Sequence, residues 1–374
     1  MKTHRLPFYL TALILGSFLL SGCTGTLVNS YPGLSATEDK IYLAYQGAIY
    51  EINPDNGQST CQFPQKSDPQ KPFYAPPTVT DELIVAGNYG HVLYGLNPTC
   101  QEINDGGTIH RVFQQRWAFN TETDDPNKRV GNFSGPSLIV NDLVLAPSTN
   151  NRLYALSIDT GAIQWMFETG NTLWAAPVSD GTTVYLPALD HNLYALHLED
   201  GKLIWQIDLG SAVTSAPVLA DDGTLYVGAL EGNLSAVNAA DGSLIWSTPT
   251  GGRLWSSPVL HEGTLYVGNA GNKVTAISAS DGSIVWQKEA GNPIIAGGVL
   301  LNDETIAFPT ETGQLVGWTL DGETQSLNQT IGGKLYTTPV VVEDNAVIAL
   351  MEGDKLLQAV SANGGLTWTF VQPK

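Results

Sequence analysis

Short apolar runs alternate with turn residues along nearly the whole chain, and no helical period is present. The stretch SAPVLADDGTLYVGALEGNLSAVNAADGSLIW, residues 215–246, divides at its turn signals into four short pieces. Each piece has the β-branched and aromatic content of a strand, and the Asp-Gly before the last piece favours an antiparallel hairpin. The pattern therefore predicts a unit of four short antiparallel strands.

This unit recurs about every 40 residues, as two independent markers indicate. From Trp165 the tryptophan of the fourth piece recurs at steps of 40, 41 and 40 residues, and a final gap of 82 residues to Trp368 spans two units. These tryptophans come four residues after the glycine of a turn, and Ser326 and Cys61 hold that position in two units. The second marker begins the successive units at Pro32, Pro77, Pro136, Pro177, Pro217, Pro258, Gly298 and Pro339. Both markers count eight units.

A four-stranded sheet cannot cover its own two apolar faces, so each unit needs a neighbour on both sides. Sheets of this size that repeat about every 40 residues are typical of β-propellers, whereas solenoid repeats of this length are usually helical. The sequence therefore predicts an all-β fold over residues 31–374, an eight-bladed β-propeller of four-stranded antiparallel blades.

The phrase ALSIDTGAIQW, residues 155–165, and its copies resemble the repeat of the PQQ-binding-like, quinoprotein-type eight-bladed propellers. The resemblance covers residues 31–370. In that family the tryptophan of each outer strand docks against the adjacent blade, and we expect looser joints at Cys61 and Ser326. The resemblance implies the docking role for Trp117, Trp165, Trp205, Trp246, Trp286 and Trp368.

The first thirty residues follow a different pattern. A basic MKTHRLP segment and the apolar run FYLTALILGSFLL predict a signal peptide over residues 1–22. The LSGC that follows resembles the lipobox of bacterial lipoproteins, which implies lipidation of Cys23 and a tether over residues 23–30. Two or more acyl chains would give stable membrane attachment. A plain secretory signal is the alternative.

The charge of the chain limits its partners. The formal net charge is −19, and removal of Lys2 and Arg5 with the signal leaves 15 basic against 36 acidic residues. Such a surface repels phosphate backbones and anionic headgroups. We therefore expect no nucleic-acid binding, and membrane attachment through the lipid anchor only.

Lipidation of Cys23 would leave two cysteines, Cys61 and Cys100, in an exported and oxidising setting. Cysteines in such compartments commonly pair. We predict a disulfide between them, with two independent buried thiols as the alternative.

Neither a catalytic nor a metal site is expected. One histidine lies in the signal segment and the other five are spread over three units without metal-ligand spacing, and GxSxG, P-loop, HExxH and CxxC motifs are absent from the sequence. PQQ-dependent alcohol dehydrogenases resemble the repeat, but no residue here matches their adjacent cysteines or calcium ligands. We therefore expect no cofactor, and the alternative of PQQ binding has no support from ligand residues.

The residues three positions before the inner-strand marker are mostly aromatic and are expected near one mouth of the central channel. There they would either contact a flat ligand or a partner peptide, or fill gaps between inner strands. Two insertions, residues 100–116 and 118–135, add long loops on the early blades. The aromatic residues are Tyr74, Phe133, Trp174, Trp255 and Tyr336.

The lipobox followed by eight blades is similar to the layout of the BamB family of outer-membrane protein assembly lipoproteins. That resemblance implies a non-catalytic scaffold for envelope proteins, either a monomer or a subunit of a larger complex. It would sit on the periplasmic face of the outer membrane in a cell with two membranes, or on the outer face of the cell membrane in a cell with one. The alternative is a propeller that binds PQQ or another small ligand, related to quinoprotein oxidoreductases.

Overall fold

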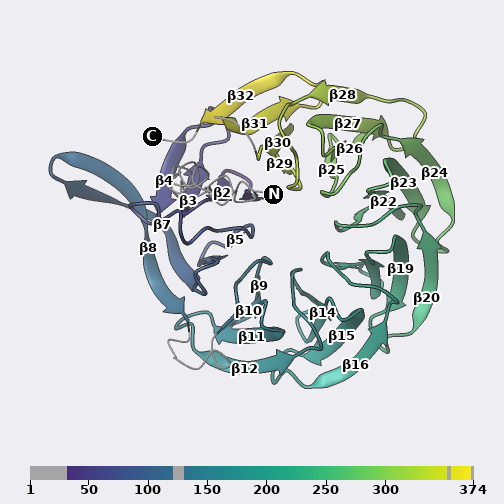
Figure 1. The fold of residues 1–374 in the computed structure, drawn as a ribbon, viewed down its shortest axis with the longest axis horizontal. Helices are drawn as coiled ribbons and strands as arrows, with labels where there is room; N and C mark the ends of the chain where they lie inside the picture. Colours follow the sequence, from purple (N-terminus) through teal and green to yellow (C-terminus); the bar gives the residue numbers. More distant parts are fainter. Residues whose placement is uncertain (1–31, 121–129, 352–354, 372–374) are drawn as a thin grey trace, which may run out of the picture.

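The computed structural model describes residues 32–120, 130–351 and 355–371, and every regular element in these ranges is a strand. The strands follow one another around a closed ring (Figure 1). No helix in the described ranges is long and apolar enough to cross a membrane. The predicted signal peptide and the tether with Cys23 lie outside the described residues.

The first four blades take up the first half of the ring. Their strands are β1 (Gly33–Ala36), β2 (Ile41–Tyr45), β3 (Ala48–Ile52), β4 (Ser59–Phe63), β5 (Thr78–Val79), β6 (Ile84–Gly87), β7 (Leu93–Asp105), β8 (Thr108–Phe119), β9 (Leu138–Val140), β10 (Leu143–Pro147), β11 (Arg152–Ser157), β12 (Ile163–Glu168), β13 (Val178–Ser179), β14 (Thr183–Pro187), β15 (Asn192–His197) and β16 (Leu203–Asp208).

The last four blades continue with the same order. Their strands are β17 (Val218–Leu219), β18 (Thr224–Gly228), β19 (Asn233–Asn238), β20 (Leu244–Pro249), β21 (Val259–His261), β22 (Thr264–Gly268), β23 (Lys273–Ser278), β24 (Ile284–Glu289), β25 (Val299–Leu301), β26 (Thr305–Pro309), β27 (Gln314–Thr319), β28 (Leu327–Thr330), β29 (Val340–Val342), β30 (Asn345–Ala349), β31 (Lys355–Ser361) and β32 (Leu366–Val371).

Each blade consists of four consecutive antiparallel strands, with the first strand nearest the ring axis and the fourth on the outside (Figure 1). Six blades are separate four-stranded sheets. The first two blades form one eight-stranded sheet because Gln62 of β4 pairs in parallel with Val112 of β8. The predicted eight-bladed, all-β propeller is confirmed.

The hydrophobic core lies between the blades. The middle strands are buried along their length, as in β18 and β19. One core cluster, for example, packs Tyr185 and Leu193 of the fourth blade against Val227 and Val237 of the fifth. Because each sheet presents apolar side chains on both faces, only a neighbour on each side removes them from water.

The docking tryptophans join six of the eight blades to the next blade. The indole Nε1 of Trp205, for example, donates to the backbone oxygen of Ala239 at 3.0 Å, and its ring covers Gly242 in the same turn of the next blade. Gly242 has a φ of +73°, and a Cβ there would lie 2.7 Å from the indole. The repeated Asp-Gly and the repeated tryptophan are therefore two halves of one joint. The same bond links Trp117 to Ile158, Trp165 to Leu198, Trp246 to Ala279, Trp286 to Leu320 and Trp368 to Pro54.

In the seventh blade, the docking position lies one residue later than the sequence alignment placed it. The docking tryptophans pair with a small residue of the third strand, as Trp286 does with Ala276, and the partner of Gly317 in this position is Leu327. Ser326 precedes it and its hydroxyl hydrogen-bonds to Thr305. The turn of this blade has one extra residue between its glycine and the docking position, so counting from the glycine selected the wrong residue. Leu327 is buried and lies over Gly364 of the eighth blade.

The ring closes by packing between the eighth and first blades, each built from one continuous stretch of chain. Tyr50 and Ile52 share a core cluster with Leu357 and Phe370. The indole of Trp368 hydrogen-bonds to Pro54, as at the other joints. Residues 26–30, which precede the first strand, lie outside the described residues.

The insertion at residues 100–116 forms the outer part of a long hairpin, β7 and β8, which projects from the ring (Figure 1). Gly106 and Gly107 form its tip with positive φ angles. Of the second insertion, residues 121–129 lie outside the described residues.

Candidate functional site

The alternating strand direction divides the loops between two faces of the ring. Connections between blades, and turns between the second and third strands, lie on one face, which we call the mouth face. Loops between the first and second strands, and Asp-Gly turns between the third and fourth, lie on the other, which we call the turn face. The inter-blade connections carry the aromatic residues selected from the sequence.

Four of the five predicted aromatic residues are accessible on the mouth face. Trp174 is 46% exposed and Trp255 is 37% exposed, which is unusual for side chains of this size. Tyr74 and Tyr336 are half-buried. The ring of Tyr74 packs on that of Tyr89 with centroids 4.2 Å apart. Trp174 and Trp255 therefore keep a large part of their surface exposed to solvent.

Phe133 does not belong to this set. It is 1% exposed and lies in the core between the second and third blades. Val178 pairs with Tyr185 in the fourth blade and Leu138 pairs with Leu145 in the third, so Phe133 corresponds to the buried Leu173. Pro136 stands one residue out of register with Pro177, the marker proline of the next blade. The position at the mouth face therefore belongs to Ser134, which the sequence reasoning missed.

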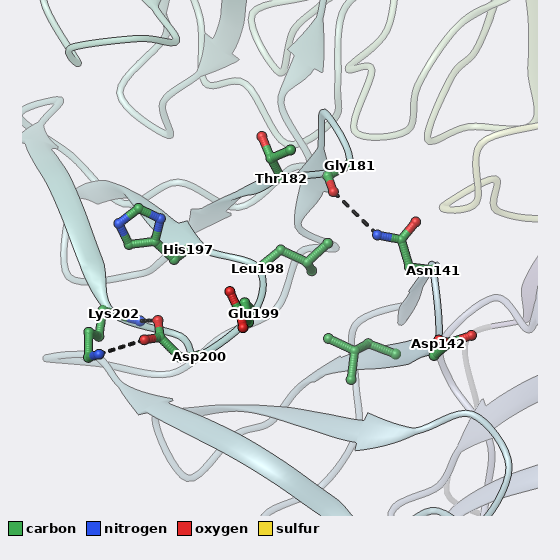
Figure 2. A pocket seen from close by; sticks show the side chains of 10 residues that line it. Asn141, Asp142, Gly181, Thr182, His197, Leu198, Glu199, Asp200 and Lys202 are labelled. Atoms are coloured by element: carbon green, nitrogen blue, oxygen red, sulfur yellow. Dashed lines mark hydrogen bonds and ion pairs between the residues drawn. The ribbon is translucent and has the colours of Figure 1, made fainter.

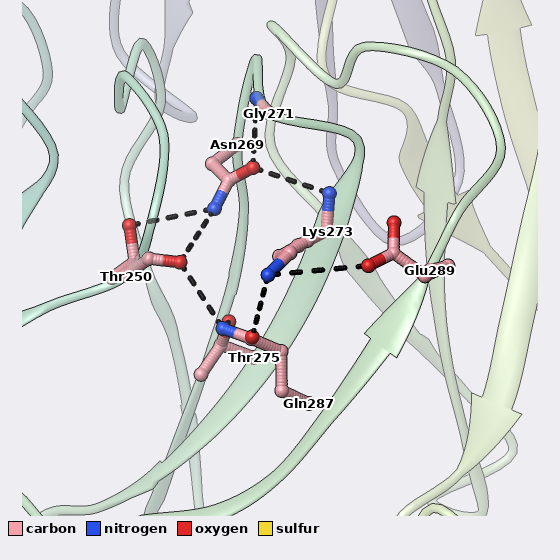
Figure 3. Close-up of polar contacts among 7 residues, drawn as sticks. All are labelled: Thr250, Asn269, Gly271, Lys273, Thr275, Gln287 and Glu289. Carbon is pink, nitrogen blue, oxygen red and sulfur yellow. Dashed lines mark hydrogen bonds and ion pairs between the residues drawn. The ribbon is translucent and has the colours of Figure 1, made fainter.

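A buried polar network fixes the connection that carries Trp255 (Figure 3). Asn269 is fully buried, and its Nδ2 donates to the backbone oxygen of Thr250 at 2.9 Å. Its Oδ1 accepts from the backbone nitrogens of Gly271 and Lys273 at 2.9 and 3.1 Å. The Nε2 of Gln287 also donates to the oxygen of Thr250, at 3.1 Å. Satisfied buried networks of this kind rigidify the structure around them.

The network continues toward the exposed ring itself. The backbone nitrogen of Ala270 donates to the oxygen of Arg253 at 2.9 Å, two residues before Trp255. Lys273 extends the network to the outer strand β24, where its Nζ lies 3.0 Å from Oε1 of Gln287 and 3.9 Å from Oε1 of Glu289. The indole of Trp255 is therefore presented by a connection that is held in place before any partner binds.

The two faces differ in charge. Among the turn-face loops other than the projecting hairpin, all of which the structure describes, the only basic residues are Lys40 and Lys202. Every loop between a first and a second strand carries at least one acidic residue. These residues are Glu38, Asp39, Asp81, Glu82, Asp142, Asp180, Asp221, Asp222, Glu262, Asp303, Glu304, Glu343 and Asp344.

The described loops of the mouth face have no such excess. They hold equal numbers of acidic and basic residues, and three of the basic residues come shortly before an exposed or half-buried aromatic residue. Because strand direction alternates, the acidic excess of the described loops lies on the turn face. The charged residues of the mouth-face loops are Asp68, Asp190, Glu231, Glu311, Lys66, Lys71, Arg253 and Lys334.

An open groove of about 770 Å³ lies on the turn face between the third and fourth blades (Figure 2). Leu143 and Leu198 contribute apolar surface, and Asp142, Glu199 and Asp200 contribute carboxylates. The side-chain nitrogen of Lys202 lies 2.6 Å from Oδ2 of Asp200, and this hydrogen bond lowers the pKa of the Asp200 carboxyl group. The groove combines an apolar floor with an acidic wall.

The acidic turns should make stability depend on pH. A hydrogen bond from a residue two positions away lowers the pKa of the carboxyl groups of Asp200, Asp241, Asp281 and Asp321 below 3.8. Below that value the unfolded chain binds more protons than the folded one, so stability is present at neutral pH and is lost as the pH falls through the lowered values. We expect a lower melting temperature at pH 3 than at pH 6.

Thermal unfolding followed by circular dichroism measures this difference. The double variant Asp241→Asn, Asp281→Asn keeps the acceptor oxygens of the turns, and its melting temperature should depend less on pH than that of the wild type. Equal melting temperatures of the wild type at the two pH values would contradict the expectation.

Titratable groups do not converge on a metal centre in the described ranges. There, no group of three His, Cys, Asp or Glu residues could hold a metal ion. His91 and His191 occupy equivalent turns of the second and fourth blades, with φ angles of 61° and 77°, and both side chains are exposed on the mouth face.

A disulfide joins Cys61 of β4 to Cys100 of β7, with Cα atoms 6.0 Å apart. Cys61 pairs with Glu51 in the register that the tryptophans hold in other blades. A covalent bond between the first and second blades therefore stands where a docking tryptophan is missing, at one of the two joints that the sequence predicted to be looser. The same bond ties down the base of the projecting hairpin.

The sequence matches the family model of outer membrane protein assembly factor BamB over residues 105–217 and 190–297, which together cover just over half of the chain. Among curated proteins no sequence matches significantly. The solved structure of BamB from Moraxella catarrhalis superimposes with a TM-score of 0.66 at 17% identity, covering 88% of this chain and 91% of that one. The computationally designed Ika8 protein superimposes with a TM-score of 0.68 at 12% identity, covering 92% and 97%.

Proposed function

Since the chain belongs to the family of outer membrane protein assembly factor BamB, we propose that it is a non-catalytic scaffold that holds partner proteins in the bacterial cell envelope. It is anchored by lipid on Cys23 and acts in the assembly of outer-membrane proteins, at the periplasmic face of the outer membrane. It works without a quinone cofactor, as a subunit of a larger complex.

The observation that carries this proposal is the pair of exposed tryptophans on the mouth face. Aromatic side chains that are exposed and already held in place are typical anchors of protein interfaces, because they bury a large area at a small entropic cost. The polar network beneath Trp255 provides that rigidity. Trp174 precedes the fourth blade and Trp255 precedes the sixth, so a partner surface that covers both would also cross the fifth blade.

The path of the chain supports an orientation in which the mouth face is near the membrane. The first strand starts from this face, where the oxygen of Pro32 accepts a hydrogen bond of 2.6 Å from the hydroxyl of Thr337. The nine residue steps from Cys23 to Pro32 can span at most about 30 Å. A lipid on Cys23 would therefore hold the aromatic residues within reach of membrane-bound partners.

Crosslinking of the native lipoprotein in cells, followed by identification of its partners, tests the proposal. We expect recovery of outer-membrane barrel-assembly components with the wild type. The double variant Trp174→Ala, Trp255→Ala should reduce that recovery at least ten-fold, because truncated interface anchors typically cost more than about 1 kcal/mol each. Met166→Ala removes an exposed apolar side chain from the outer strand β12 and serves as the control.

Equal recovery with the double variant and the wild type would contradict the assignment of the mouth face. The alternative is a quinone or another flat ligand stacked on the same aromatic residues. Quinone absorbance in the purified protein, together with no recovered partner, would favour that alternative over the scaffold.

A further inference from the structure

The outer strands of the fourth, fifth and sixth blades each begin with two exposed apolar residues, directly after the acidic Asp-Gly turn. These side chains are between 40% and 58% exposed, and we call them the apolar rim. Isolated exposed apolar residues are normal, but a patch that repeats across neighbouring blades is typical of an interaction surface. The rim consists of Leu203, Ile204, Leu244, Ile245, Ile284 and Val285.

A β-bulge at the same place in each strand disfavours strand addition to this edge. In the fifth blade, Ala236 pairs with Trp246 and Val237 pairs with Leu244, so Ile245 is the extra, bulged residue. The same shift occurs in the fourth and sixth blades. Bulges at edge strands twist the backbone away and interrupt pairing. A partner on the rim would therefore contact side chains and not extend the sheet.

Two grooves on the turn face adjoin the apolar rim. A groove of about 300 Å³ between the fourth and fifth blades is lined by Ile204 and Trp205 together with Asp180 and Asp222. The larger groove shown in Figure 2 lies one blade earlier and ends at Lys202, next to Leu203. Each groove places apolar surface beside carboxylates.

The charge around the rim determines which molecule fits it. Asp200, Asp241 and Asp281 stand in the turns that precede the three apolar pairs, and the rest of this face is acidic. A second copy would bring the same acidic face against this one, and an anionic lipid surface would be repelled. A segment with both apolar and basic side chains satisfies both features of the surface.

We propose that the apolar rim binds a basic, amphipathic segment of a partner protein. Its apolar side chains cover the rim, and its lysine or arginine residues face the carboxylates of the preceding turns. This surface lies opposite the mouth face and does not depend on the function proposed above. The ring would then hold two different protein segments at once, one on each face.

Binding of a synthetic probe peptide of leucine, lysine and glutamine to the full-length protein in nonionic detergent tests this proposal, with protein-free micelles as the blank. Fluorescence anisotropy gives the dissociation constant. We expect binding that weakens as salt rises, and at least ten-fold weaker binding to the triple variant Ile204→Thr, Ile245→Thr, Val285→Thr. These exposed β-branched substitutions retain strand propensity, and unchanged thermal unfolding verifies the fold.

Two further sets of variants make the test specific. Asp200→Asn, Asp241→Asn and Asp281→Asn together keep the turn acceptors and should weaken binding several-fold and reduce its salt dependence. Met166→Thr on β12 and the mouth-face variant Trp174→Ala, Trp255→Ala should bind the peptide as the wild type does. The mouth-face result separates this surface from the one in the proposed function.

Three results would overturn the proposal. The first is unchanged binding by the triple rim variant, and the second is equally tight binding of a serine and lysine peptide with the same charge. The third is a wild-type dimer in sedimentation velocity that the rim substitutions dissociate, which would assign the rim to a second copy of the chain.

Discussion

Replacement of Trp246 by alanine is expected to lower the free energy of unfolding by about 3–5 kcal/mol, the usual effect of truncating a large aromatic side chain, because the partly buried indole packs against the hydrophobic cluster between the fifth and sixth blades. The indole joins the fifth blade to the sixth. Its Nε1 donates to the oxygen of Ala279 at 3.0 Å, and its ring covers Gly282, where a Cβ would lie 2.6 Å away. It also packs on Tyr226 with ring centroids 5.9 Å apart. Urea unfolding followed by circular dichroism measures the change.

Trp174→Ala is the matched control, because it removes the same side chain from an exposed position on the mouth face. We expect that substitution to change the free energy of unfolding by less than about 1 kcal/mol, as surface substitutions usually do. A change of under about 1 kcal/mol for Trp246→Ala would mean that the residue is not an inter-blade joint.

The double variant Cys61→Ser, Cys100→Ser is expected to lose about 3–4 kcal/mol of stability. The disulfide closes a loop with a sequence separation of 39 residues, and release of a loop of this length raises the entropy of the unfolded chain by about that amount. The bond also replaces a docking tryptophan between the first two blades. Urea unfolding of the oxidised wild type and of the variant gives the difference.

Reduction with dithiothreitol should destabilise the wild type and leave the double variant unchanged, which separates loss of the bond from other effects of the substitutions. Thiol titration of the denatured, unreduced wild type provides an independent measurement. Two reactive thiols from Cys61 and Cys100 would exclude the bridge.

The sequence was sufficient to predict the eight blades because their signals are local. An Asp-Gly turn requires a positive φ at the glycine, and a tryptophan at constant spacing marks the strand that follows. Both features depend on neighbours within one hairpin. The structure shows why they recur together, since Gly242 and Trp205 contact each other across a blade boundary. Local regularity in each unit was therefore enough to predict the ring.

Counting residues along the sequence gave the wrong position in two blades, because the strand register there is shifted by one residue. Ser326 and Phe133 were assigned by distance from a glycine and from a proline. Strand pairing instead places Leu327 in the joint, and it places Phe133 in the core. A shift of one residue moves a strand side chain to the opposite face, and only the pairing partner determines which residue has that position.

The sequence by itself determined the all-β repeat, the number of blades, and which residues interrupt the pattern, because short-range turn and strand preferences specify them. Only the tertiary structure showed which of the residues that depart from the repeat lie on the same surface. It placed the exposed tryptophans on one face, the acidic turns and the apolar rim on the other, and Cys61 beside Cys100. Those groupings arise from strand direction and from contacts between blades, which join residues distant in the chain and leave no local signal in it.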